Sequence, residues 1–285
     1  VAQNMKRMDY DCDLISGKVN NVHYQHGQAD AFHHHYEYDA DHRITQVYTS
    51  NDLDARWTGE QDDPLWTADA KYFYYDHGPL ARVEYGKDHV QGVDYAYTIQ
   101  GWIKGVNSNL LNPNKDMGND GKTGHVNEDF ARDVFGYTLN YYKGDYMPVD
   151  VVKWNAASTR FEAFHNSSDM MSNRNDLFNG NISSMVTTIS KADTGKVDLA
   201  SYPLGNAYRY DQLNRITRSS SYNNFDLDSN KLKNNGASIA GLYRNTFSYD
   251  ANGNIKTQMK YDSLGVIMDS LVYKYETINA KLRRN

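Results

Sequence analysis

The chain has 285 residues, enough for one large β domain or two ordinary domains, and its net charge of −6 leaves no basic stripe for nucleic acid. It contains 24 Tyr against nine Phe, and aromatic residues make up 13% of it, which excludes a disordered chain. Its low mean hydropathy of −0.79 therefore predicts a buried side built from Tyr, Asn and Thr rather than from Leu and Ile.

A Tyr-Asp pair that follows another aromatic residue recurs along the chain. Copies lie at residues 36–39, 73–76, 208–211 and 247–250, and partial copies at 8–11, 95–97 and 273–275. The two rings of each copy share one face of a strand, because side chains alternate. The Asp can bond the backbone two residues on and begin a turn.

A residue that tolerates positive φ follows three positions after the Asp of most copies. It is His42, Asn214 or Gly253, whereas the copy at 76–79 has its Gly one place early. A second short strand leaves each turn, at residues 43–45, 80–83, 215–217 and 254–256. The repeated unit is therefore strand, turn, strand, which predicts a meandering antiparallel sheet.

Insertions separate the copies. Residues 51–69 are expected to form a long loop whose two Trp side chains pack it back onto the protein. Residues 107–124 are expected to form a flexible loop, and residues 158–175 a loop or a short helix. Residues 135–142 and 179–186 resume strand patterns. No break in composition marks a boundary, so residues 1–285 are expected to form a single β-sheet region.

The ordered series of copies resembles the signature of YD-repeat, or RHS-repeat, proteins over nearly the whole chain. The more specific stretches, residues 71–82, 97–107, 178–182, 210–217 and 249–255, resemble the Bacteroidota type of RHS polypeptide. The signature positions, with a structural role, are Tyr38, Asp39, Tyr75, Asp76, Tyr97, Tyr210, Asp211, Tyr249, Asp250 and Gly253. The chain departs from the pattern where no Asp follows Tyr97 or Tyr275.

The resemblance implies an all-β fold in which the repeats coil as a ribbon into part of a hollow shell. It implies a structural shell segment, before the RHS-associated core, that encloses and delivers a C-terminal toxin or other effector. The partners would be the remaining coils of the shell, the effector and secretion machinery, and the location secreted or at the cell surface. The alternative is a cell-surface adhesion or carbohydrate-binding β module.

No constellation of residues predicts an enzyme, and no cofactor is expected. The repeated Asp residues are periodic, which catalytic residues are not, and the single cysteine, Cys12, has no evident base. The longest apolar runs are a few residues, too short to span a membrane. Val1 is not a start residue, so we expect a longer polypeptide.

Two segments contain residues that bind metals in other proteins. His33 and His35 share a strand face, and His23 and His26 are the nearest candidates for a third ligand, although a solvated strand edge is the favoured interpretation. In residues 112–124, Asp116 could begin a calcium loop, but Gly118 and Asn127 then miss the required acidic positions. No metal site is therefore predicted.

Overall fold

A computed structural model describes residues 5–61, 63–112, 114–147, 164, 175–190, 203–227, 229–232, 242–275, 277–278 and 281–282. The insertion expected near 158–175 lies outside the described residues except for Phe164 and Asn175. The chain divides into two compact units. The first unit comprises residues 1–95 and 118–133, and the second comprises residues 96–117 and 134–285.

The first unit is built on consecutive strands. They are β1 (Met8–Cys12), β2 (Val19–Tyr24), β3 (Phe32–Tyr38), β4 (Ile44–Ser50), β5 (Thr67–Tyr74), β6 (Leu80–Tyr85) and β7 (Gln91–Tyr97), whose last two residues belong to the second unit. The pairs β1–β2 through β6–β7 are all antiparallel.

The second unit continues the same pattern after β7. Its main strands are β8 (Ile103–Val106), β9 (Phe135–Asn140), β10 (Ser184–Ile189), β11 (Leu204–Tyr210), β12 (Ile216–Tyr222), β15 (Leu242–Tyr249), β16 (Ile255–Tyr261) and β17 (Ile267–Val272). Two small pairs lie apart from these, β13 (Phe225–Asp226) with β14 (Lys231–Leu232) and β18 (Thr277–Ile278) with β19 (Lys281–Leu282).

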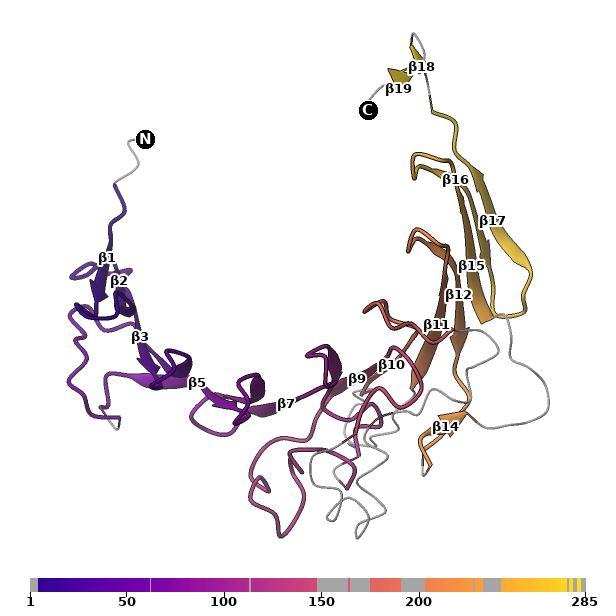
Figure 1. The fold of residues 1–285 in the computed structure, drawn as a ribbon. Coiled ribbons are helices and arrows are strands. Elements are labelled where there is room, and N and C mark those ends of the chain that lie inside the picture. The colour runs from indigo at the N-terminus through magenta and orange to yellow at the C-terminus, as the bar shows by residue number, and fades with distance from the viewer. Residues whose placement is uncertain are drawn as a thin grey trace. The chain divides into compact units, whose positions relative to one another are not determined.

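The fold is all-β, and the described residues contain no helix. Fifteen strands form one open antiparallel sheet in chain order, from β1 to β12 and then β15, β16 and β17 (Figure 1). Each strand in it is bonded to the strands that precede and follow it in this order. The predicted meandering antiparallel sheet is confirmed. Within the described residues, no helix is long and apolar enough to cross a membrane.

Five hairpins share one irregularity just before the turn. The pairing register shifts by one residue at Glu37/Tyr38, Phe73/Tyr74, Arg209/Tyr210, Ser248/Tyr249 and Lys260/Tyr261. Such a bulge bends and twists the strand locally. In these five hairpins the residue at the bulge is therefore a tyrosine.

The face that is most deeply buried in the central strands is not the tyrosine face. Buried positions alternate along β7, β9, β10 and β11, and they carry small or polar residues: Gly92, Asp94, Ala96, Gly136, Thr138, Asn140, Ser184, Val186, Thr188, Gly205 and Ala207. Tyr95, Tyr137 and Tyr208 lie at the half-buried positions between them. The low hydropathy thus reflects a buried face of Gly, Ser, Thr and Asn, and the expected share of Tyr in it was too large.

Insertions cover that face. Asn109 from the expected flexible loop is fully buried, and Thr138 Oγ1 donates to its Oδ1 at 2.9 Å. Leu110 and Leu111 beside it are also buried. Residues 107–111 are therefore packed into the second unit, and the expectation of a flexible loop was wrong for them.

In the first unit, Trp57 and Trp66 pack the insertion after β4 against the sheet. Their rings lie 5.6 Å apart edge to face, and Trp57 contacts the buried Tyr48 at 4.5 Å between ring centroids. The prediction that two Trp hold this loop is confirmed.

Candidate functional site

In the turns that begin at Asp39, Asp211 and Asp250, the Asp closes the turn through both carboxylate oxygens. Asp211 accepts from the Arg215 backbone N–H at 3.0 Å and from Arg215 Nε at 2.6 Å. Asp39 holds Arg43 in the same way, at 2.8 and 2.7 Å. The hydrogen bond from the Arg215 backbone N–H holds the pKa of Asp211 below its ordinary value.

The fourth residue of these turns has the predicted positive φ. It is 71° at His42, 61° at Asn214 and 90° at Gly253. The N–H of each donates to the carbonyl of the turn Asp at 3.0–3.1 Å. The backbone prediction from the spacing after Asp is therefore confirmed.

Each such arginine also reaches the next hairpin of the repeat. Arg215 lies over the ring of Tyr249 at 4.6 Å and donates through Nη1 to the carbonyl of Asp250 at 3.0 Å. Arg43 lies over Tyr74 at 4.4 Å and donates to the carbonyl of Gly78 at 3.1 Å. A cation over an aromatic ring, together with a charged hydrogen bond, ties one turn to the next.

The hydroxyl of the same tyrosine donates a hydrogen bond to the preceding hairpin. Tyr249 donates to the carbonyl of Ile216 at 2.6 Å, and Tyr74 donates to that of Ile44 at 2.8 Å. We call the Asp and Arg of one turn together with the Tyr of the next hairpin a turn clamp. Hydroxyl bonds of the same kind join Tyr38 to Val19, Tyr210 to Ile182 and Tyr275 to Ile255.

The structure places the second copy of the repeat one residue earlier than Tyr75-Asp76. Tyr74, not Tyr75, occupies the bulge and donates to the preceding hairpin. Tyr75 takes the turn position of Asp, because its N–H bonds the carbonyl of Pro79 as Asp39 bonds Arg43. Gly78 then falls at the normal fourth position, with φ of 116°.

Two further turns fit the pattern. After Tyr97, Thr98 replaces the Asp: its N–H bonds the carbonyl of Trp102, and its Oγ1 accepts from the Trp102 N–H at 3.3 Å. Tyr261-Asp262, which was not predicted as a copy of the repeat, begins a turn of the same kind: the Val266 N–H donates to Asp262 Oδ1, and Gly265 has φ of 78°. The signal was present in the sequence, since Gly265 follows three positions after Asp262 as Gly253 follows Asp250.

Replacing Tyr210 with phenylalanine is expected to lower the free energy of unfolding by about 0.5–1.5 kcal/mol, the net contribution of one hydrogen bond. The variant keeps the ring and loses only the bond to the Ile182 carbonyl. Tyr208→Phe is the matched control, because its hydroxyl donates to no described residue, and it should change stability by less than about 0.5 kcal/mol. Denaturant unfolding measures both, and equal losses would contradict a stabilising role for the hydroxyl bond between Tyr210 and Ile182.

The loop considered for calcium supplies a partner to a buried arginine. Arg82 Nη2 donates to Asp120 at 2.7 Å, Nη1 to Asp94 at 2.5 Å and Nε to Glu84 at 3.0 Å. Burial acts to lower the pKa of Arg82, but these carboxylates outweigh it and raise the pKa above its ordinary value. Asp120 therefore serves as a counter-ion to Arg82.

Of the histidines singled out in the sequence, three come together. His23 on β2 lies opposite His33 on β3, and His26 lies in the turn between these strands. His23 Nδ1 is 2.9 Å from His33 Nδ1, and one potential ligand atom from each histidine lies within 4.8 Å of the others. His33 is fully buried, so the expected solvated strand edge is wrong for this residue.

His35 does not join them. Its ring stacks on Trp57 at 3.9 Å, and its Nδ1 donates to Asn21 Oδ1 at 2.7 Å. Burial lowers the pKa of His35 to about 4, so it is neutral at physiological pH. The pairing of His33 with His35 in one metal site is therefore not what the structure shows.

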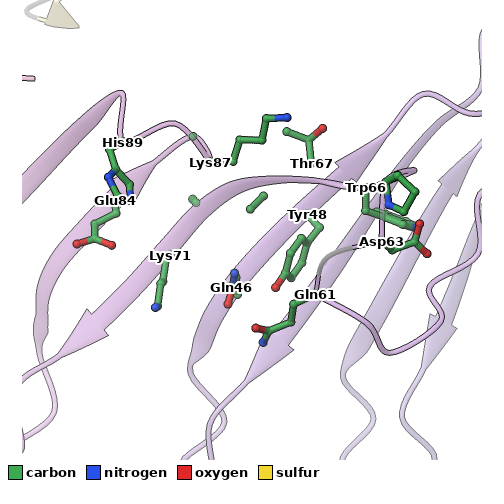
Figure 2. Close-up of a pocket in the computed structure, with 14 residues that line it drawn as sticks. Gln46, Tyr48, Gln61, Asp63, Trp66, Thr67, Lys71, Glu84, Lys87 and His89 are labelled. Atoms are coloured by element: carbon green, nitrogen blue, oxygen red, sulfur yellow. The ribbon is translucent and has the colours of Figure 1, made fainter. Parts of the chain in front are cut away.

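A polar cavity of about 470 Å³ lies beside Tyr48 and Trp66 in the first unit (Figure 2). It is lined by Gln46, Tyr48, Gln61, Asp63, Pro64, Trp66, Thr67, Ala68, Ala70, Lys71, Glu84, Gly86, Lys87 and His89. Its two aromatic residues, Tyr48 and Trp66, are 1% and 6% exposed. They present little ring surface on which a sugar could stack.

These features define the chain as an open ribbon of repeated antiparallel hairpins joined by turn clamps. No family model matches the chain, and no curated protein matches it. It is similar to three solved structures, each at 9% sequence identity.

Two of these structures contain TcdB2-TccC3, one with TEV and one with Cdc42. They have TM-scores of 0.37 and 0.36, and each covers 94% of this chain. The third, a Photorhabdus luminescens Tc holotoxin pore with TccC3 carrying D651A, has a TM-score of 0.34 and covers 90%. This chain spans 11–13% of the chains that it matches.

Proposed function

We propose that this chain is a stretch of the β-shell of an RHS-repeat polypeptide, and that its work is to enclose and deliver a C-terminal effector. The observation that carries the proposal is the turn clamp, which links one repeated hairpin to the next at two places in the chain. Such a linkage builds a sheet that extends by adding hairpins, and an extended curved sheet can form a wall. The proposed location, by resemblance to the family, is secreted or at the cell surface.

The contacts of the tyrosine rings favour a structural role in a wall and not a role in binding sugars. Tyr249 has Arg215 over its ring and its hydroxyl bonded to Ile216, and Tyr74 is occupied in the same way by Arg43 and Ile44. A ring that stacks on a sugar needs an open face, and an arginine already occupies one face of each of these two rings. This argues against the carbohydrate-binding alternative at the clamp positions.

The outer strand also fits a wall. Ile267, Met268 and Val272 of β17 are exposed, and β16 is the only strand paired with β17 among the described residues. An apolar edge strand with free backbone groups recruits another strand. We propose that further coils of the shell cover it.

The test is limited proteolysis of the natural polypeptide that carries this chain and the segment after it. With the shell intact, the C-terminal segment should resist a protease that digests the same segment once it is expressed alone. Changing Arg43 and Arg215 together to alanine should open the wall and make the segment sensitive. Lys256→Ala, an exposed side chain on β16, is the matched control and should leave protection unchanged.

The outcome that would contradict containment is equal digestion of the C-terminal segment in the natural polypeptide and alone. If the segment is digested but the polypeptide binds glycans through this chain, the adhesion alternative replaces the proposal.

A further inference from the structure

We propose that His23, His26 and His33 form a binding site for a divalent transition metal of the Zn²⁺ class. The three residues come from one hairpin of the first unit: β2, the turn after it, and β3. Nothing in the turn clamps requires a histidine at any of these positions. Imidazole nitrogen is a ligand that Zn²⁺, Cu²⁺ and Ni²⁺ share, and three of them with one open position is a common zinc arrangement.

The rings converge edge to face and do not stack. Their centroids are 4.8 Å apart for His23 and His33, 5.5 Å for His26 and His33, and 5.7 Å for His23 and His26, with planes inclined by 63–66°. Inclined rings can aim nitrogen lone pairs at one point. In a tetrahedral zinc site two ligand nitrogens are about 3.3 Å apart, so the nitrogens, now within 4.8 Å, need only small side-chain rotations.

A carboxylate orients one of the ligands. His23 Nε2 lies 3.2 Å from Asp11 Oδ2, so this nitrogen carries the proton and donates it. The lone pair of His23 is then on Nδ1, which is the atom that faces His33 at 2.9 Å. Metal-binding histidines are held in this way by a carboxylate on their other nitrogen. Asp54, 3.8 Å from His26 Nε2, is placed to orient the second ligand.

His33 gives an independent indication of a ligand. It is 0% exposed, and its Nε2 has no hydrogen-bond partner among the described residues. A buried polar atom without a partner is uncommon in a folded protein and calls for an explanation such as an ion. A metal bound by His33 through Nε2 itself supplies that partner.

The open coordination position would face solvent-accessible space. A polar cavity of about 360 Å³ adjoins the cluster, and it is lined by Asp9, Asp11, Asn21, His23, His26, Arg56 and Trp57. Water can reach the fourth position from this cavity. The same site would join the turn between β2 and β3 to the sheet, because His26 belongs to neither strand.

The test uses the 285-residue chain after treatment with a chelator and removal of the chelator. Calorimetric titration with Zn²⁺ should show one ion per chain with a Kd on the order of 1 µM or tighter. Co²⁺ in place of Zn²⁺ should give the visible absorption of a four-coordinate nitrogen site. His26→Gln, in a partly exposed turn where it will not disturb the sheet, should abolish both signals, and Asp11→Asn should weaken binding about 10–100-fold.

His34→Gln is the matched control, because His34 lies on β3 beside His33 but on the opposite face, near Phe32 and Tyr36. It should bind Zn²⁺ as the parent chain does, and added Zn²⁺ should raise the Tm of the parent and of His34→Gln but not of His26→Gln. The proposal is overturned if the parent binds no stoichiometric Zn²⁺. It is also overturned if His26→Gln binds as tightly as the parent, or if His34→Gln loses binding to the same extent.

Discussion

Replacing Arg82 with methionine should lower the free energy of unfolding by about 3–5 kcal/mol, the cost of removing one partner from a buried ion pair. The guanidinium is bonded to three carboxylates, those of Glu84, Asp94 and Asp120, and the Asp120 side chain is fully buried. Methionine has a similar volume, so little of the loss would come from a cavity. The variant leaves these negative charges close together without their guanidinium.

Neutralising the carboxylates should recover part of this loss. Adding Asp94→Asn and Asp120→Asn to the Arg82→Met variant removes the uncompensated charges, and denaturant unfolding should show a smaller deficit than Arg82→Met alone. Arg43→Met is the control, because Arg43 is about 30% exposed and pairs with a carboxylate that water also reaches, so its loss should be clearly smaller. A loss below about 1 kcal/mol for Arg82→Met would mean that water replaces the guanidinium.

In the second unit, Lys104→Met should cost a similar amount, about 3–5 kcal/mol. Lys104 Nζ donates to Asp145 Oδ1 at 2.7 Å and to Asn140 Oδ1 at 2.8 Å. The side chains of Lys104 and Asp145 are 5% and 6% exposed. Asp145 also accepts from the Tyr141 N–H just after β9. The loop that contains Asp145 is therefore joined both to β8, through Lys104, and to the end of β9.

Two variants show whether charge causes the loss. Lys104→Met combined with Asp145→Asn should be more stable than Lys104→Met alone, because no buried charge then lacks its ammonium partner. Lys143→Met, at an exposed position of the same loop, should stay within about 0.5 kcal/mol of the parent. Thermal unfolding of the four proteins compares them, and a double variant no better than Lys104→Met would show that packing, and not charge, accounts for the effect.

The turns were predictable because their chemistry is local. The Asp, the residue three positions later and the strand that follows lie within a few residues, so Asp211, Asn214 and Gly253 could be placed before any tertiary contact was known. The doublet Tyr74-Tyr75 could not be placed in the same way. It offers two registers that differ by one residue, and only the backbone bond to Pro79 and the hydroxyl bond to Ile44 distinguish them.

The buried face and the histidine cluster depend on distant residues. Which face of β9 and β10 is buried is decided by Asn109 and its neighbours, nearly 30 residues before Thr138 in the chain. The spacing of His23, His26 and His33 identified them as candidates. Their convergence follows from the backbone between β2 and β3, where Gln25 and Gly27 have φ of 52° and 74°, which composition does not encode.

The turn clamp has a consequence for how such a chain can lengthen. The hairpin of Tyr210, Asp211 and Arg215 carries both halves of a junction, since Tyr210 donates to the preceding Ile182 carbonyl and Arg215 lies over Tyr249 of the next hairpin. A tandem duplication of one hairpin therefore supplies both halves of a new junction at once, the tyrosine that meets the old copy and the turn that meets the next. Gene duplication can extend this ribbon by whole hairpins without any compensating substitution, whereas a deletion of part of a hairpin breaks two junctions.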